Sequence, residues 1–255
     1  MPTKLRCSRL SRVADLIINK TALIIKKGSV IMSLIPKKLE KTIEKKITLD
    51  YLFYLPKGYE ESDEKYPLVI FLHGAGERGS DVEKLKVHGI PKLVSEGKNF
   101  EFIAVAPQCP EDKWWGGFVE DEFENLLREC IDDYRIDTAR IYLTGLSMGG
   151  FGTWYYGAKF NKAFAALAPI CGGLNASSVN LEIYKDIPMW VFHGAKDSTV
   201  PLSESSDLVN ALNEIDANVK FTVYPEAEHD SWTETYENPA FYNWMLSQYN
   251  KNFEL

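Results

Sequence analysis

The chain has 255 residues, 45% of them hydrophobic and 25% charged, which is the composition of an ordinary globular protein. Its formal net charge of −7 argues against a nucleic-acid-binding face. No run reaches the roughly 18 apolar residues of a membrane-spanning helix, so we expect neither nucleic acid nor a membrane as partner. The four cysteines form no CxxC pair and are expected to be reduced thiols, in neither disulfides nor a zinc site: Cys7, Cys109, Cys130 and Cys171.

Residues 1–31 differ from the rest in charge, with seven lysines and arginines against one acid. We predict that they form a basic N-terminal extension outside the fold, and that residues 32–255 form a single domain. Asn19 and Lys20 interrupt the apolar patches, so the segment lacks the apolar core of a secretory signal. Two interpretations stay open: a mitochondrial-type presequence, or an upstream extension of a reading frame that starts at Met32. We expect a cytoplasmic protein, or an organellar one if the segment is a targeting signal.

After residue 43, short apolar runs alternate with longer helical patterns. Residues 43–55 predict one or two edge strands before the turn at Pro56-Lys57-Gly58. Strands alternating with helices predict an α/β fold, in which helices cover both faces of a mainly parallel sheet. Further strands are predicted at 67–72, 102–106, 140–144, 164–170, 189–192 and 219–224, and helices at 119–134, 149–160, 203–214 and 239–249.

The segment Gly145-Leu146-Ser147-Met148-Gly149 lies between a predicted strand and a predicted helix. In this setting the pentapeptide is typical of a nucleophile elbow, a sharp turn that pushes the serine hydroxyl outward. A side chain at either flanking glycine is expected to collide with the neighbouring strand or helix. The helix start also directs free N–H groups and partial positive charge at the site. We therefore predict that Ser147 is a nucleophile.

Partners for Ser147 follow in the order acid, then histidine. Asp197 comes just after the strand at 189–192, and His229 lies in the loop after the last strand. We predict that His229 accepts the serine proton and that Asp197 orients the imidazole. Asp230 is the rival acid, although a sequence neighbour cannot easily reach the far nitrogen of the ring. His193 is expected to make a structural hydrogen bond.

A second segment with a chemical role is the loop "LHGAGERGSD", which follows the strand at 67–72. Such a loop supplies one N–H group of an oxyanion hole, and the residue after the nucleophile supplies the other. We predict the backbone N–H groups of Met148 and Ala75 as these donors, with Gly74 or Gly76 as alternatives to Ala75. His73 is expected to anchor the loop, whereas Glu77 and Arg78 form a local ion pair or contact substrate.

Several segments together resemble a known group of proteins: "YPLVIFLHGAGERGSD", "APQCP…WW", "RIYLTGLSMGGFGTW", "PICGG", "IPMWVFHGAKDSTVP" and "VYPEAEHDSWTETY". In this order they resemble serine esterases related to dienelactone hydrolases, feruloyl-type carbohydrate esterases and the catalytic domain of prolyl oligopeptidases. The resemblance covers about residues 42–250. It implies an α/β-hydrolase fold with a mainly parallel sheet of about eight strands, and a carboxylesterase that needs no cofactor or metal.

Three tryptophans lie in loops on the expected catalytic side: Trp114, Trp115 and Trp232. They are predicted to form an aromatic platform for an acyl or sugar group, and the alternative is that they close the top of the core. The short region 106–119 leaves no room for a long apolar lid, so we expect small soluble or carbohydrate-linked esters. Short peptides are the alternative substrate, and a non-catalytic binding scaffold is the alternative of another class. Nothing in the sequence indicates an oligomeric state.

Overall fold

The computed structural model describes residues 36–174 and 179–255. The predicted extension, residues 1–31, lies outside the described residues. The chain divides into two units, Met1–Lys45 and Lys46–Leu255, and every strand and helix given below belongs to the second unit. None of the helices in the described part of the chain is long and apolar enough to cross a membrane.

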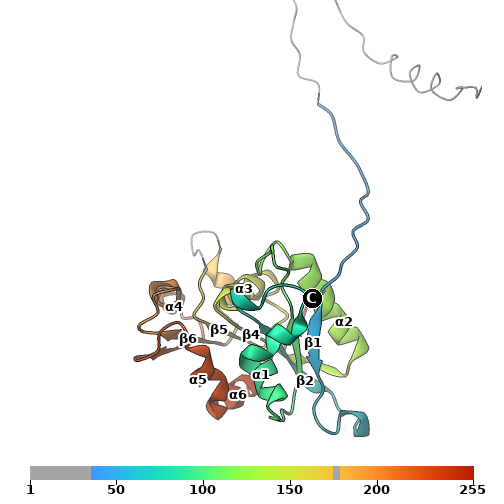
Figure 1. The fold of residues 1–255 in the computed structure, drawn as a ribbon. Helices are drawn as coiled ribbons and strands as arrows, with labels where there is room; N and C mark the ends of the chain where they lie inside the picture. Colours follow the sequence, from blue (N-terminus) through green and yellow to red (C-terminus); the bar gives the residue numbers. More distant parts are fainter. Residues whose placement is uncertain (1–35, 175–178) are drawn as a thin grey trace, which may run out of the picture. The chain divides into compact units, whose positions relative to one another are not determined.

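The centre of the second unit is a seven-stranded sheet with the order β1-β3-β2-β4-β5-β6-β7 (Figure 1). β1 pairs with β3 in the antiparallel direction, and all other neighbours are parallel. The parallel strands therefore end at one common edge of the sheet. The strands are β1 Tyr51–Tyr54, β2 Tyr66–Leu72, β3 Ile103–Pro107, β4 Ile136–Leu146, β5 Ala166–Ile170, β6 Met189–Gly194 and β7 Val219–Tyr224.

Six α-helices accompany the sheet in the described residues, and they cover both of its faces (Figure 1). Alternate residues of β2 belong to different clusters, as the period of two in a strand requires. Leu68, Ile70 and Leu72 pack with residues of α2, α3 and α4, whereas Val69 and Phe71 pack with residues of α1, α5 and α6. The helices are α1 Gly89–Ser95, α2 Glu120–Asp133, α3 Met148–Lys159, α4 Ser203–Glu214, α5 Trp232–Glu237 and α6 Pro239–Leu246.

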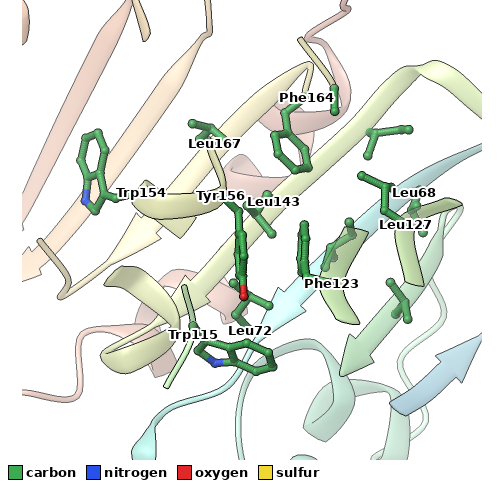
Figure 2. Close-up of a cluster of buried hydrophobic side chains, with 14 of the residues drawn as sticks. Leu68, Leu72, Trp115, Phe123, Leu127, Leu143, Trp154, Tyr156, Phe164 and Leu167 are labelled. Atoms are coloured by element: carbon green, nitrogen blue, oxygen red, sulfur yellow. The ribbon is translucent and has the colours of Figure 1, made fainter. Parts of the chain in front are cut away.

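Large aromatic rings fill the first of these clusters (Figure 2). Phe123 of α2 stacks on Tyr156 of α3 with ring centroids 4.0 Å apart, and both side chains are almost fully buried. Burial of each such side chain contributes about 1.5–3 kcal/mol to folding. Trp115 lies at the end of this cluster near Leu72, the last residue of β2. The core therefore extends up to the edge of the sheet where the parallel strands end.

The predicted order of strands and helices agrees with the structure, with differences at particular elements. The sheet has seven strands rather than about eight, because the segment 43–55 contributes β1 alone and residues 36–50 form no strand. Charged residues at 44–46 leave that stretch without a continuous apolar face to bury. Two short helices, α1 and α5, were not predicted, since six or seven residues are too few to display a clear helical period.

The connection from β4 to α3 requires glycine at two positions. A Cβ atom on Gly149 would lie 2.0 Å from the carbonyl oxygen of Leu72, and one on Gly145 would lie 2.4 Å from the carbonyl oxygen of Gly149. These contacts are with backbone, which cannot move aside as the end of a flexible side chain can. The expected collision of a flanking side chain with strand and helix is therefore present at both glycines.

We expect Gly149→Ala to destabilise the protein by about 3 kcal/mol or more, because the start of α3 must move away from the end of β2. Gly76→Ala is the matched control, since a Cβ atom there meets nothing within 4 Å. Urea unfolding of the two variants measures the difference. Equal midpoints for both would show that the contact at Gly149 relaxes at little cost.

Candidate active site

The residues predicted to carry chemistry gather where the parallel strands end. Ser147 follows β4, Asp197 follows β6, and His229 follows β7. The loop that begins at His73 follows β2, the neighbour of β4 in the sheet. In open α/β sheets, sites form at this carboxyl edge because the loops after adjacent strands converge there.

Ser147 has a left-handed backbone conformation, with φ of 52° and ψ of −117°. A non-glycine residue is uncommon in this region, and such strain persists only where the surroundings hold it. The Ser147 N–H donates to the carbonyl oxygen of Ile170 at 3.0 Å, and its own carbonyl oxygen accepts from Phe151 at 3.1 Å. The turn is thus fixed from β5 on one side and from α3 on the other.

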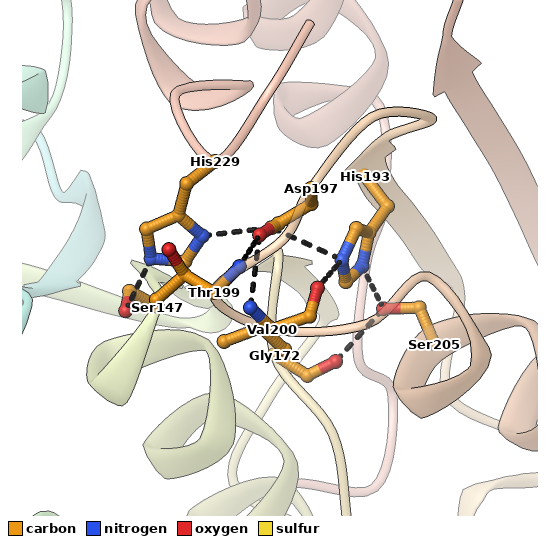
Figure 3. A network of polar contacts seen from close by, with 8 residues as sticks. All are labelled: Ser147, Gly172, His193, Asp197, Thr199, Val200, Ser205 and His229. Carbon is orange, nitrogen blue, oxygen red and sulfur yellow. Dashed lines mark hydrogen bonds and ion pairs between the residues drawn. The ribbon is translucent and has the colours of Figure 1, made fainter.

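The three side chains of the predicted triad form two hydrogen bonds in series (Figure 3). His229 Nε2 lies 2.9 Å from Ser147 Oγ, and His229 Nδ1 lies 2.7 Å from Asp197 Oδ2. The other carboxylate oxygen, Asp197 Oδ1, accepts from the N–H groups of Thr199 and Val200 at 2.9 and 2.8 Å. This is the geometry in which a histidine can take a proton from a serine while a carboxylate holds the ring.

The surroundings of Asp197 keep its carboxylate ionised. Burial by itself would raise the pKa of Asp197, but hydrogen bonds from His229, Val200 and Thr199 outweigh it and lower the pKa below its ordinary value. An ionised acid is what the second hydrogen bond of the triad requires, because it stabilises the imidazolium that forms when His229 gains a proton.

Neither the rival acid nor His193 takes the place of a triad residue. Asp230 accepts hydrogen bonds from the N–H and the hydroxyl of Thr233, both at 2.9 Å, at the start of α5. Its carboxylate therefore caps a helix rather than holding His229. His193 is fully buried, and its ring contacts the hydroxyl of Ser205 and the carbonyl oxygen of Val200. The predicted structural hydrogen bond of His193 is thus present.

The two predicted oxyanion donors each begin a helix. Met148 is the first residue of α3, and Ala75 is the first residue of a short 3₁₀ turn, Ala75–Glu77. The N–H at such a position has no acceptor within its own helix and is free to bind a ligand. The contact of Gly149 with Leu72 and His73 brings these two helix starts together. Their role as oxyanion donors stays a prediction.

His73 anchors this loop as expected. Its Nε2 accepts from the N–H of Cys109 at 2.9 Å, and its Nδ1 therefore donates to the carbonyl oxygen of Gly74 at 2.6 Å. Burial lowers the pKa of His73 to about 4, although the hydrogen bond to Gly74 acts in the opposite direction. The ring is neutral at pH 7 and makes one bond with each of its nitrogens.

Glu77 and Arg78 do not bind each other as the ion-pair alternative required. Arg78 Nε donates to the carbonyl oxygen of Ala75 at 3.0 Å, and its guanidinium lies 5.6 Å from the ring centre of Trp114. Glu77 instead faces His88, with 3.9 Å between Oε1 and Nε2. Arg78 therefore both supports the oxyanion loop and orients an aromatic side chain beside it.

The three tryptophans have three different environments, and the common platform is wrong. Trp115 is 6% exposed, belongs to the core and donates from Nε1 to the carbonyl oxygen of His73 at 3.0 Å. Trp232 is 9% exposed and meets the ring of His229 edge-on, with centroids 5.2 Å apart. Trp114 is 47% exposed. The alternative of a core plug holds for Trp115, Trp232 braces His229, and Trp114 alone of the three can present a wide surface to a substrate.

Sequence reasoning missed two contributors to the site. His88 Nδ1 accepts from Trp232 Nε1 at 3.3 Å, so the residue before α1 supports the residue that braces His229. Cys171, after β5, has a φ of 40°, and its thiol lies against the backbone of Ser147. His88 stands in no recognisable motif, and the segment PICGG around Cys171 does not by itself indicate what the thiol contacts. Their importance comes from the adjacency of β5 to β4 and of α1 to α5, which no local pattern reveals.

One group of metal-ligand side chains occurs among the described residues: Cys171, Asp197 and His229, with ligand atoms within 4.8 Å of one another. Burial raises the pKa of the Cys171 thiol to about 12, and metal ions bind the thiolate rather than the thiol. The hydrogen bond between Asp197 and His229 already occupies the other two side chains. The group is therefore a poor metal site and fits the role of a hydrogen-bonded triad with a buried thiol beneath it.

Comparison with known proteins shows the family. Residues 112–252, more than half of the chain, match the model of the dienelactone hydrolase family. The chain belongs to this family. A solved thermostable esterase is 37% identical, with a TM-score of 0.67 over 79% of this chain and 59% of its own. A ferulic acid esterase, 22% identical with a TM-score of 0.58 over 76% of this chain and 89% of its own, shares the α/β-hydrolase fold.

Curated relatives of this family member include much longer proteins. The bifunctional acetylxylan esterase/xylanase XynS20E of Neocallimastix patriciarum is 28% identical over 145 residues, 52% of this chain and 20% of its own length. Dipeptidyl-peptidase 5 of Aspergillus oryzae (strain ATCC 42149 / RIB 40) is 23% identical over 245 residues, 77% of this chain and 33% of its own. The chain thus spans about a fifth to a third of these two relatives.

The neutral state of His73 predicts a loss of stability in acid. Because its folded pKa of about 4 is below the ordinary 6.5, the unfolded chain binds the extra proton between these values. The stability is present above pH 6.5 and is lost as the pH falls to 4, by about 3 kcal/mol. Chemical unfolding at pH 7, 5.5 and 4 measures the slope, and His73→Asn should flatten it. An unchanged slope in that variant would assign the acid sensitivity to other groups.

Proposed function

We propose that this chain is a serine ester hydrolase in which Ser147 is the nucleophile, His229 the general base and Asp197 the residue that orients His229. The observation that carries the proposal is the pair of hydrogen bonds in series, 2.9 Å from Ser147 Oγ to His229 Nε2 and 2.7 Å from His229 Nδ1 to Asp197 Oδ2. The strained conformation of Ser147 supports it, since strain of this kind concentrates at functional residues.

The reaction follows from these positions. Ser147 Oγ attacks the ester carbonyl carbon while its proton passes to His229 Nε2, and the carbonyl oxygen becomes an oxyanion. His229 then gives the proton to the leaving alcohol, and an acyl-serine ester remains. Water, deprotonated by His229, attacks that ester, and the proton returns to Ser147 as the carboxylic acid leaves. Each step transfers one proton between His229 Nε2 and Ser147 Oγ, water or the substrate, so the reaction as written requires no cofactor.

The oxyanion is assigned to the backbone N–H groups of Met148 and Ala75. Each is the first N–H of a helix or 3₁₀ turn, and both residues pack against the core. Donors fixed in this way stabilise the developing charge without having to reorganise, which is worth about 3–4 kcal/mol per donor. Arg78, through its bond to the carbonyl oxygen of Ala75, keeps the second donor in place.

The substrate class that we propose is small soluble esters, including acyl esters of carbohydrates. Trp114 is half-exposed beside Arg78 on the oxyanion loop, where an indole face can stack on a sugar ring or an aromatic acyl group. Similarity to an acetylxylan esterase/xylanase and to a ferulic acid esterase supports esters of this kind. Similarity to a dipeptidyl-peptidase makes short peptides the alternative, which paired ester and peptide substrates distinguish.

Labelling with a fluorophosphonate probe tests the proposal most directly. An activated serine forms a stable covalent bond with the probe, whereas a non-catalytic scaffold of the same fold does not. We expect the wild-type chain to be labelled at Ser147 and the variant Ser147→Ala not to be labelled. A folded wild-type chain that resists labelling would exclude serine catalysis.

Substitution of the triad gives the matching kinetic prediction. Ser147→Ala should lower kcat on p-nitrophenyl acetate by about 10⁶-fold, and Asp197→Asn by about 10⁴-fold because the wrong tautomer of His229 becomes favoured. Asp230→Asn is the matched control and should retain wild-type kcat, since Asp230 binds Thr233 instead. Greater damage from Asp230→Asn than from Asp197→Asn would reverse the assignment of the acid.

Substitutions of Trp115 and Trp114 are expected to change different properties, stability for Trp115 and substrate binding for Trp114. Trp115→Ala should lower stability by about 3–5 kcal/mol, because it leaves a cavity beside Leu72 and Gly152. Trp114→Ala should leave the melting temperature unchanged and raise KM for bulky aromatic or sugar esters, with kcat on acetate esters retained. Steady-state kinetics on paired acetate and feruloyl esters, beside a thermal melt, measure both effects. An unchanged KM ratio in Trp114→Ala would remove Trp114 from the substrate site.

A further inference from the structure

His193 is a titratable side chain that the proposed reaction does not use. It lies next to the end of β6, four residues before Asp197, and no part of it is exposed. A buried imidazole is costlier than an aliphatic side chain unless each ring nitrogen has a partner. Both nitrogens of His193 do have partners: Val200 lies in the loop that carries Asp197, and Ser205 lies in the first turn of α4 (Figure 3).

The Nε2 atom of His193 faces two acceptors. The carbonyl oxygen of Val200 lies 2.9 Å from it, and Asp197 Oδ2 lies 3.3 Å from it. Neither group can donate, so Nε2 carries a hydrogen; it is donated to the carbonyl oxygen of Val200, and Asp197 Oδ2 lies beside the same N–H as a charged neighbour. Asp197 Oδ2 is the same oxygen that accepts from His229 Nδ1. Asp197 Oδ2 therefore lies beside ring nitrogens of two histidines, hydrogen-bonded to His229 and in electrostatic contact with His193.

The Nδ1 atom of His193 faces the hydroxyl of Ser205 at 2.8 Å, and this hydroxyl lies 2.8 Å from the carbonyl oxygen of Gly172. The single hydroxyl hydrogen can point to Gly172, in which case His193 carries two hydrogens and a positive charge, or to Nδ1, in which case the ring is neutral. In both arrangements the Nε2–H still faces Asp197 and Val200. The contact with the acid does not depend on which arrangement is present.

Asp197 consequently receives donors on both oxygens. Oδ1 accepts from two backbone N–H groups, and Oδ2 lies within reach of His229 and His193. The carboxylate cannot rotate without breaking a contact, and the turn from 197 to 200 is held by His193 through the Val200 carbonyl oxygen as well. The position of Asp197, and through it the line to His229 and Ser147, is thereby also set by contacts with His193.

We propose that His193 is a positioning residue that acts through Asp197 on the alignment and basicity of His229. The proposal rests on the proposed function, since it concerns the same reaction. The titratable groups that face Asp197 are His229, His193 and the Cys171 thiol. Loss of the His193 donor leaves the charge of Asp197 less compensated, which favours protonated His229. The acidic limb of the profile of kcat/KM against pH then moves to higher pH.

The variants to compare are His193→Leu, which removes both contacts, and His193→Gln, whose amide can place an N–H near the position of Nε2. His193→Leu should lower kcat about 10- to 100-fold with KM nearly unchanged, because the triad is misaligned rather than the substrate site. It should also move the acidic limb of the kcat/KM profile to higher pH. His193→Gln should recover part of the lost kcat and reverse part of this pH shift. Val209→Ala is the matched control, a buried change on α4 that lowers stability without touching the network.

The outcomes separate this proposal from the proposed function. If His193→Leu folds and shows the same kcat and the same acidic limb of kcat/KM as Val209→Ala, the positioning role of His193 is overturned and the serine mechanism is not affected. A wild-type chain that a fluorophosphonate does not label would overturn the mechanism itself. The low-field proton resonance of the hydrogen bond between His229 and Asp197 needs no turnover, and an unchanged resonance in His193→Leu would overturn positioning independently. If His193→Leu does not fold, His193→Asn replaces it, because the shorter amide can reach only Ser205 and not Asp197. Equal kcat values for His193→Gln and His193→Asn would then overturn the proposal.

Discussion

The direct backbone contact between the start of α3 and the end of β2 is the constraint on which the site depends. It exists because Gly149 has no side chain to separate the helix from the carbonyl groups of Leu72 and His73. The contact brings the first N–H of α3 beside the first N–H of the turn at Ala75, and it sets the place from which Ser147 projects. The rest of the site is arranged around that fixed point by loops from β5, β6 and β7.

Much of this arrangement could be predicted from the sequence because it is local in the chain. The elbow at Ser147 needs only a strand, two glycines and a helix, and the order of Asp197 and His229 follows from where strands end. The environment of Trp115 could not be predicted in the same way. Its burial depends on contact with Gly152 and on the carbonyl oxygen of His73, which are distant in sequence. Exposed and buried tryptophans look alike when they are neighbours in one loop.

The number of strands at the β1 edge of the sheet also depends on contacts that are distant in the sequence. The alternation of apolar and polar residues at 43–55 predicts one or two strands. A strand forms only where a neighbouring strand accepts and donates its hydrogen bonds and where one of its faces is covered. β1 has both, through β3 and the residues around Phe53. His88 and Cys171 could not be predicted as contributors for a different reason: the role of each comes from which strands and helices are neighbours in space, not from its own segment.

The buried thiols have a consequence for following the protein in solution. Cys109, Cys130 and Cys171 are free and buried, and burial raises the pKa of each to about 12, so none of them reacts as a thiolate while the fold is intact. Alkylation of these three thiols therefore reports openings of the fold rather than surface chemistry. Cys171 lies against the turn of the nucleophile, whereas Cys130 belongs to α2 and packs in the core. Their separate alkylation rates distinguish an opening confined to the catalytic edge from the unfolding of the whole sheet.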